Sequence, residues 1–258
     1  MILKFLKLRP NKKYKAISIV YFILRMLVIY VFFAQLHDRN YENVFLCVLT
    51  MILFLVPSFI EQRIHIDIPD TLETIILLFI FSAEILGEIN SYYLIFPYWD
   101  TILHTINGFL ASAIGLSLID ILNKNKRFSI SLSPLFVALV AFCFSMTIGV
   151  VWEFFEFAMD TYFGMDMQKD TYIRSFQSVL LNQNGHNIPV KVNFDSVIIN
   201  GEPWKGYIDI GLIDTMMDLF VNFIGAVVFS TFGYFYIKGR GKSNFLKRFI
   251  LKIYTENE

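Results

Sequence analysis

The stretch Leu212–Ile237, LIDTMMDLFVNFIGAVVFSTFGYFYI, decides the fold class of this protein. It is longer than the roughly 20 mostly apolar residues with which an α-helix crosses a bilayer. Its only charged residues, Asp214 and Asp218, stand close to its beginning. The stretch therefore predicts a transmembrane helix with acidic side chains near one end.

Five further runs are also long and apolar enough to cross a bilayer. The six predicted spans are Ala16–Leu36, Asn43–Ile60, Thr71–Ile89, Asp100–Leu122, Ser133–Asp160 and Leu212–Ile237. A membrane β-barrel would instead show alternating segments of about 10 residues. We therefore expect an all-α polytopic membrane protein built as a bundle of about six transmembrane helices.

The composition of the whole chain supports this class. Of 258 residues, 56% are hydrophobic and 17% are charged, whereas a soluble domain carries about 25% charged residues. The 22 Lys and Arg balance the 22 Asp and Glu, so the basic excess typical of nucleic-acid binders is missing. The bilayer is thus the expected partner, and no nucleic-acid partner is expected.

The basic residues predict the orientation. Sixteen of the 22 Lys and Arg lie in the two tails and in two of the loops, all on one side of the predicted bundle. By the positive-inside rule, both termini are cytoplasmic. The chain then divides into a basic tail 1–15, a membrane domain 16–237 and a basic tail 238–258. Apolar residues at helical spacing in the second tail suit an interfacial helix. The alternative is that the basic residues of this tail serve only as a topology signal.

The connection 161–211 is long and is expected on the extracytoplasmic side. It holds the turn signals Asn184-Gly185 and Asn200-Gly201, near the β-prone runs Val190–Phe194 and Ser196–Ile199. Such a pattern predicts a small hairpin or lid. An ordered connector without a role is the alternative.

Acidic residues gather at the predicted outer ends of four spans, where charge is costly. These acids are Glu84, Glu88, Asp100, Glu153, Glu156, Asp160, Asp214 and Asp218. His104, Asn107 and Asn222 stand at the same depth. Spacings of three and four residues place the polar side chains of each span on one helix face.

Small residues continue these polar faces along the same helices. Gly108, Ser145 and Gly225 are examples, and small residues let membrane helices approach closely. We therefore expect the acidic faces to meet inside the bundle. So many carboxylates close together must be protonated or neutralised by a cation. Oxygen ligands with one imidazole suit a divalent metal ion such as Mg²⁺, Mn²⁺ or Zn²⁺.

The predicted roles follow from this arrangement. Glu153 is the predicted general base, and the predicted metal ligands are His104, Asp100, Glu156, Asp214 and Asp218. The predicted supporting residues are Asn107, Asp160, Asn222, Glu84 and Glu88. Simpler explanations exist for single residues: Asp100 and Asp214 can cap their helices.

Three other features receive no catalytic role. Asp70 and Glu73 have the spacing of a capping box. Trp152 is typical of an interface-belt aromatic residue. Arg25 lies within the first span, where it can pair with an acid or extend toward the membrane surface.

The second half of the chain resembles the YjdF-like bacterial inner-membrane family and, more distantly, the VanZ-like membrane proteins. The matching motifs are Asp100-Thr-Ile-Leu-His104, Trp152-Glu153-Phe-Phe-Glu156 and Asp214-Thr-Met-Met-Asp218-Leu-Phe-Val-Asn222-Phe-Ile-Gly225. VanZ-like proteins usually have Gln where Glu156 stands, so the W-E-x-x-E form points to the YjdF-like branch. The resemblance implies a bacterial cytoplasmic-membrane protein and an address for the site, but no reaction.

Three classes of function fit these observations. The first is a metal-dependent hydrolase or transferase that acts on a lipid or cell-envelope substrate at the outer leaflet. The alternative is a cation- or proton-coupled transporter that uses the same acids, or a non-catalytic membrane protein in envelope homeostasis. The apolar inner halves of the last three spans favour the enzyme.

Overall fold

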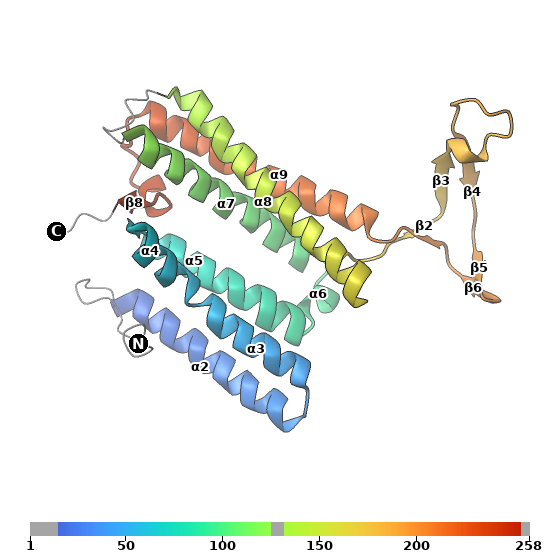
Figure 1. The fold of residues 1–258 in the computed structure, drawn as a ribbon, viewed down its shortest axis with the longest axis horizontal. Coiled ribbons are helices and arrows are strands. Elements are labelled where there is room, and N and C mark those ends of the chain that lie inside the picture. Colours follow the sequence, from blue (N-terminus) through green and yellow to red (C-terminus); the bar gives the residue numbers. More distant parts are fainter. Residues whose placement is uncertain (1–14, 125–131, 254–258) are drawn as a thin grey trace. The chain divides into compact units, whose positions relative to one another are not determined.

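The computed structural model describes residues 15–124 and 132–253, and these residues are mostly helical (Figure 1). Apart from Lys15, the predicted basic tail 1–15 lies outside the described residues, as do Lys126, Arg127 and the last five residues of the second tail. The chain forms two compact units, Met1–Ile148 with Val221–Glu258, and Gly149–Phe220. Two long helices, α8 (Pro134–Phe163) and α9 (Leu212–Lys238), each contribute to both units.

The first unit is a helical bundle. Its remaining helices are α2 (Lys15–His37), α3 (Tyr41–Leu53), α4 (Val56–Ile64), α5 (Asp70–Phe81), η1 (Ser82–Ile89), α6 (Tyr92–Ile95), α7 (Trp99–Lys124) and η3 (Leu246–Arg248). Two short strands, β1 (Ile66–Asp67) and β8 (Lys252–Ile253), pair in antiparallel fashion.

Among the described residues, five helices are long and apolar enough to cross a membrane. They are Ile17–His37, Tyr41–Arg63, Trp99–Asn123, Pro134–Phe163 and Leu212–Lys238. The remaining predicted span, Thr71–Ile89, is helical over its whole length but changes type. It begins as α5 and continues as the π-helix η1.

The predicted capping box at the start of α5 is wrong. Pro69, not Asp70, occupies the N-cap position, and the backbone N–H of Glu73 donates to the Pro69 carbonyl at 2.9 Å. Glu73 is 2% exposed and accepts a hydrogen bond from the hydroxyl of Tyr21 on α2, at 2.9 Å. Arg25 lies over the ring of the same tyrosine, with its guanidinium carbon 4.9 Å from the ring centroid. A contact between distant helices thus replaces the local one.

The second tail does not form the interfacial helix that its spacing suits. Beyond Lys238, which ends α9, only the three residues of η3 are helical among its described residues, in a 3₁₀ turn. Leu246, Phe249 and Ile250 are buried in the core of the first unit, and the backbone N–H of Leu251 donates to Ser117 Oγ at 3.0 Å. The apolar side chains of the tail therefore stabilise the bundle through burial.

Close packing of α7 against α9 sets the register of the bundle. A Cβ atom on Gly225 would collide with the carbonyl oxygen of Thr105, and one on Gly108 would collide with that of Asn222. Farther along, the hydroxyls of Ser112 and Ser230 lie 2.8 Å apart. The first unit thus confirms that small residues let these two helices approach closely.

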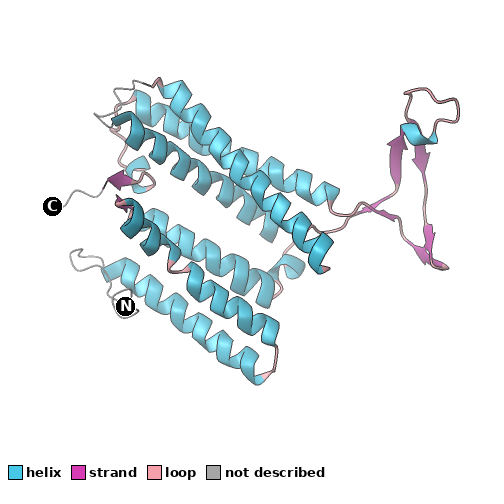
Figure 2. Ribbon diagram, viewed as in Figure 1, coloured by secondary structure: helices cyan, strands magenta, loops and turns pink. Residues whose placement is uncertain are grey.

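The second unit combines the ends of two helices with an arm of short β-ribbons (Figure 2). Its strands are β2 (Tyr172–Ile173), β3 (Ser175–Ser178), β4 (Val190–Asn193), β5 (Val197–Ile199), β6 (Glu202–Trp204) and β7 (Tyr207–Ile208). They pair as β2–β7, β3–β4 and β5–β6. Asn200 and Gly201 both have positive φ angles, 51° and 88°, in the turn between β5 and β6. This turn confirms the hairpin that the Asn-Gly pair predicts.

Candidate functional site

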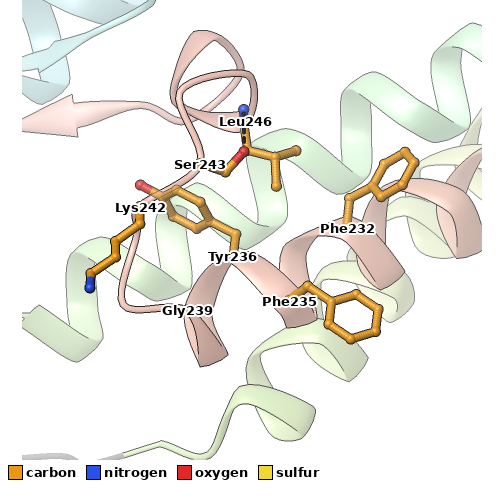
Figure 3. A pocket seen from close by; sticks show the side chains of 7 residues that line it. All are labelled: Phe232, Phe235, Tyr236, Gly239, Lys242, Ser243 and Leu246. Atoms are coloured by element: carbon orange, nitrogen blue, oxygen red, sulfur yellow. Dashed lines mark hydrogen bonds between the residues drawn. The ribbon is translucent and has the colours of Figure 1, made fainter.

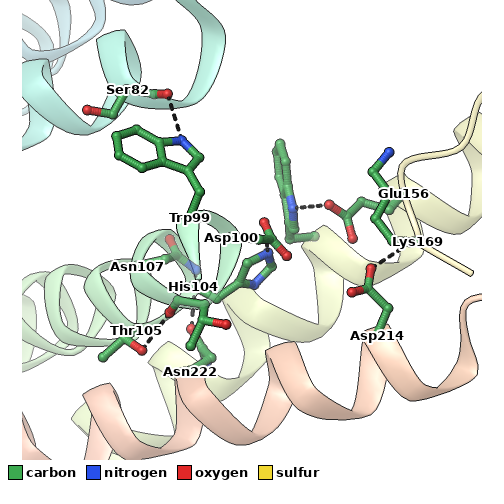
Figure 4. Close-up of polar contacts among 12 residues, drawn as sticks. Ser82, Trp99, Asp100, His104, Thr105, Asn107, Glu156, Lys169, Asp214 and Asn222 are labelled. Carbon is green, nitrogen blue, oxygen red and sulfur yellow. Dashed lines mark hydrogen bonds and ion pairs between the residues drawn. The ribbon is translucent and has the colours of Figure 1, made fainter. Parts of the chain in front are cut away.

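The first unit contributes an acid and an imidazole, both from the beginning of α7. His104 Nε2 lies 3.5 Å from a carboxylate oxygen of Asp100, one helical turn earlier (Figure 4). His104 is 6% exposed. The predicted spacing thus places both side chains on one helix face.

Amide side chains form the next layer of the first unit. Asn107 of α7 donates to the side-chain oxygen of Asn222 of α9 at 3.2 Å (Figure 4). The amide nitrogen of Asn222 lies 3.4 Å from the backbone oxygen of Ser145 on α8, and Ser145 Oγ donates to the Gly108 carbonyl at 2.7 Å. The structure therefore joins three helices at this depth through polar contacts.

The second unit contributes three buried carboxylates. Glu153 and Glu156 of α8 and Asp218 of α9 are each 4–6% exposed. One carboxylate oxygen from each of the three lies within 4.8 Å of the others. Asp214, one turn before Asp218, also has an oxygen within 4.8 Å of an Asp218 oxygen. These distances suit a shared cation, since like charges so close together require neutralisation.

Trp152 orients one of these carboxylates. Its indole N–H donates to Oε1 of Glu156 at 2.8 Å. The sequence predicts a belt residue at this position, so this role went unnoticed. The signal that could have found it is the i,i+4 spacing of a donor and an acid on one helix. Hydrogen bonds of this kind fix the direction of metal-binding carboxylates.

Two of the predicted site acids bind the backbone of the connecting loop. Asp160 accepts hydrogen bonds from the N–H groups of Met167 and Gln168, at 2.6 and 2.8 Å. Asp214 accepts from the N–H of Lys169 at 2.7 Å (Figure 4). Asp160 therefore organises the loop, and Asp214 serves the loop while standing beside Asp218.

The beginning of α9 is capped by a residue that received no role from the sequence. Asp209 accepts hydrogen bonds from the N–H of Ile213 at 2.8 Å and from that of Thr171 at 2.7 Å. It thus ties the loop to the first turn of α9. Asp214, which the sequence also allows as a helix cap, accepts a hydrogen bond from the loop.

The acids of η1 stand apart from these groups. Glu84 is half-buried and Glu88 is exposed. Neither belongs to a group of three or more ligand-type side chains within the described ranges. The sequence placed them with the other acids because they stand at similar depth.

Charge also crowds at the base of the loop. The pKa of Asp170 is raised above its usual value, first because the side chain is partly desolvated and then because Asp166 and Asp209 lie near. A hydrogen bond from the Gly211 backbone acts in the opposite direction. The acidic character of the second unit thus extends from its helix ends into the loop.

Comparisons with known proteins give the family. The family described as a predicted membrane protein (DUF2238) matches residues 18–239, which include all three motifs. This match is compatible with the YjdF-like resemblance. Neither the curated proteins nor the solved structures yield a match to the chain. On the evidence of this match and of its apolar helices, the chain belongs to the DUF2238 family of predicted multi-pass membrane proteins.

Proposed function

We propose that this protein is a metal-dependent hydrolase or transferase of the bacterial cytoplasmic membrane, with its site on the extracytoplasmic side. His104, Asp100, Glu156, Asp214 and Asp218 are the proposed ligands of a divalent ion. Glu153 is the proposed general base. We also propose that the protein is distantly related to the VanZ-like membrane proteins.

The register of the first unit carries the proposal. Gly108 of α7, Ser145 of α8 and Asn222 of α9 meet in one layer. Within the bundle α7 runs parallel to α9 and opposite to α8 (Figure 1). One helical turn covers about 5.4 Å. A step toward the start of α7 or of α9 therefore leads to the same end of the bundle as a step toward the end of α8.

Residues with ligand-type side chains follow in these directions along each helix. His104 lies one turn from Gly108, and Asp218 lies one turn from Asn222. Glu153 lies two turns beyond Ser145 on α8. Each helix is continuous, so each of these residues follows the polar layer along its own helix.

The donor set fits a divalent ion in chemistry. Carboxylate oxygens with one imidazole suit Mn²⁺ or Zn²⁺, and carboxylates alone suit Mg²⁺. Such an ion would polarise a phosphoryl or carbonyl oxygen of the substrate and lower the pKa of a bound water. Within the protein, the indole of Trp152 holds Glu156 in place, and Glu153 can accept a proton.

Packing beyond the polar layer favours an enzyme over a transporter. Leu116 of α7, Val137 of α8 and Phe229 of α9 are fully buried in one apolar core. A transported ion would have to pass such a layer, whereas an enzyme needs access from one side only. A lipid or cell-envelope molecule is the proposed substrate class because it would reach the site from the membrane.

Metal analysis of the purified full-length protein tests the proposal. We expect one divalent ion per wild-type chain, and at least about tenfold weaker binding in His104→Ala and Asp218→Asn. Asp195→Asn, an exposed acid of the same unit as Asp218, is the matched control and should bind like wild type. Wild-type protein without stoichiometric metal, or full retention by both site variants, would overturn the proposal.

A further inference from the structure

The segment after α9 is folded against the first unit instead of trailing from it. Phe249 packs edge-on against Phe109 and Phe229, with ring centroids 5.4 and 6.2 Å away. The strand β8 pairs with β1, which connects α4 to α5. The position of this segment beside the end of α9 is thereby fixed.

This folding leaves a pocket at the end of α9, of about 170 Å³ (Figure 3). Phe232 and Phe235 line its helix side and are 45% and 61% exposed. Lys242 and Ser243 line it from the turn that follows the helix. The pocket therefore has an apolar part along a membrane-spanning helix and a cationic part just beyond that helix.

The charge around the pocket has one sign along the chain. The described residues 238–253 include six Lys and Arg and no acid. A second pocket, of about 420 Å³, also involves this segment, but Asp120 lines it together with Lys247 and Lys252. The smaller pocket has no acidic lining residue, so it is the better match for an anion.

We propose that the pocket at the end of α9 binds an anionic phospholipid. Its phosphate would lie at Lys242 and Ser243, and an acyl chain would lie along Phe232 and Phe235. A phospholipid suits the site because it joins an anionic group to an apolar chain, as the pocket joins a lysine to two exposed phenyl rings. Lysine near an anionic leaflet contributes about 1 kcal/mol to such binding.

Native mass spectrometry of the full chain in detergent, titrated with dioleoylphosphatidylglycerol, tests this inference. We expect Lys242→Ala to weaken binding about fivefold, which corresponds to about 1 kcal/mol. Arg248→Ala is the matched control, because Arg248 is an exposed base of the same segment that lines neither pocket. Lys242→Gln keeps the length of the side chain and should repeat the effect.

Three outcomes would overturn the inference. Equal weakening by Arg248→Ala would show a diffuse charge effect. Equal binding of dioleoylphosphatidylcholine would show that the apolar contact alone matters. Displacement of the lipid by inorganic phosphate at millimolar concentration would identify a site for free anions. The lipid pocket lies entirely within the first unit. A negative result in the lipid experiment would therefore not affect the proposed metal site.

Discussion

Substitution of Gly225 by alanine probes the contact that sets the helix register. The added methyl group would overlap the carbonyl oxygen of Thr105 and lie 2.9 Å from the amide nitrogen of Phe109. Both are backbone atoms of α7, so relief requires the two helices to separate. Overpacking of this kind costs up to about 3 kcal/mol, while alanine in a helix regains about 1 kcal/mol over glycine. The expected net loss of stability is therefore about 2 kcal/mol.

Gly233→Ala is the matched control on the same helix. The methyl group there would meet the terminal Cδ1 methyl of Leu116, a side-chain atom that can rotate away. Its backbone change is identical, so the intrinsic helix gain is the same. We expect its unfolding free energy to stay within about 1 kcal/mol of wild type.

Unfolding of both variants by sodium dodecyl sulfate, added to dodecyl maltoside micelles and followed by circular dichroism, measures the difference. Gly225→Ala should unfold at a clearly lower fraction of dodecyl sulfate than Gly233→Ala. Equal stability of the two variants would refute the close approach of α7 and α9.

Three further outcomes are expected. Tyr21→Phe removes the hydrogen bond to buried Glu73 and should lower the unfolding free energy by about 1–3 kcal/mol in the same titration; unchanged stability would contradict the bond. Trp152→Phe removes the hydrogen-bond donor to Glu156 and should weaken metal binding at least about tenfold in calorimetry. Unchanged binding would show that the indole has no orienting role. The raised pKa of Asp170 means that the folded loop binds this proton more tightly than the unfolded chain, so stability falls as pH rises through that pKa. Asp170→Asn should therefore slow proteolysis of the loop relative to wild type, and the effect should be larger at pH 7 than at pH 4. An equal effect at both pH values would contradict the raised pKa of Asp170.

Hydropathy predicted most of the membrane helices because it depends on local composition. It could not predict the change of helix type at Ser82, where α5 continues as η1. Wider hydrogen-bond spacing in a π-helix is stabilised by contacts outside the segment, such as the indole of Trp99 donating to the Ser82 carbonyl at 3.3 Å. Such contacts do not appear in a local hydropathy pattern.

In the β-ribbons of the second unit, one feature depends on local sequence and another depends on contacts between distant residues. Asn200-Gly201 encodes its hairpin directly, since both residues accept positive φ angles. The pairing of β2 with β7 joins strands of two residues from opposite ends of the loop. Strands this short carry no periodicity, so their pairing could not be predicted from sequence.

Sequence spacing places the acids on helix faces but does not reveal the contacts that each side chain makes. Glu73 looked like a local cap because Asp70 stands three residues before it, yet its partner Tyr21 lies on another helix. Glu153, Glu156 and Asp218 gather within ligand distance, whereas Asp160 binds loop backbone. Long-range packing therefore decides which acids can share a cation.

The loop that connects α8 to α9 is held at its base by hydrogen bonds to both helices. Asp160 at the end of α8 and Asp214 at the start of α9 bind three consecutive backbone N–H groups, those of residues 167–169. The side-chain amide of Gln168 also donates to the hydroxyl of Thr215 at 2.6 Å. Opening this base would break four hydrogen bonds, three of them to carboxylates, at a cost of about 1.5–3 kcal/mol each for the charged ones. These hydrogen bonds thus hold the two helix ends that carry Glu156 and Asp218 at a fixed separation, so metal affinity should depend on Asp160 although Asp160 is not a ligand.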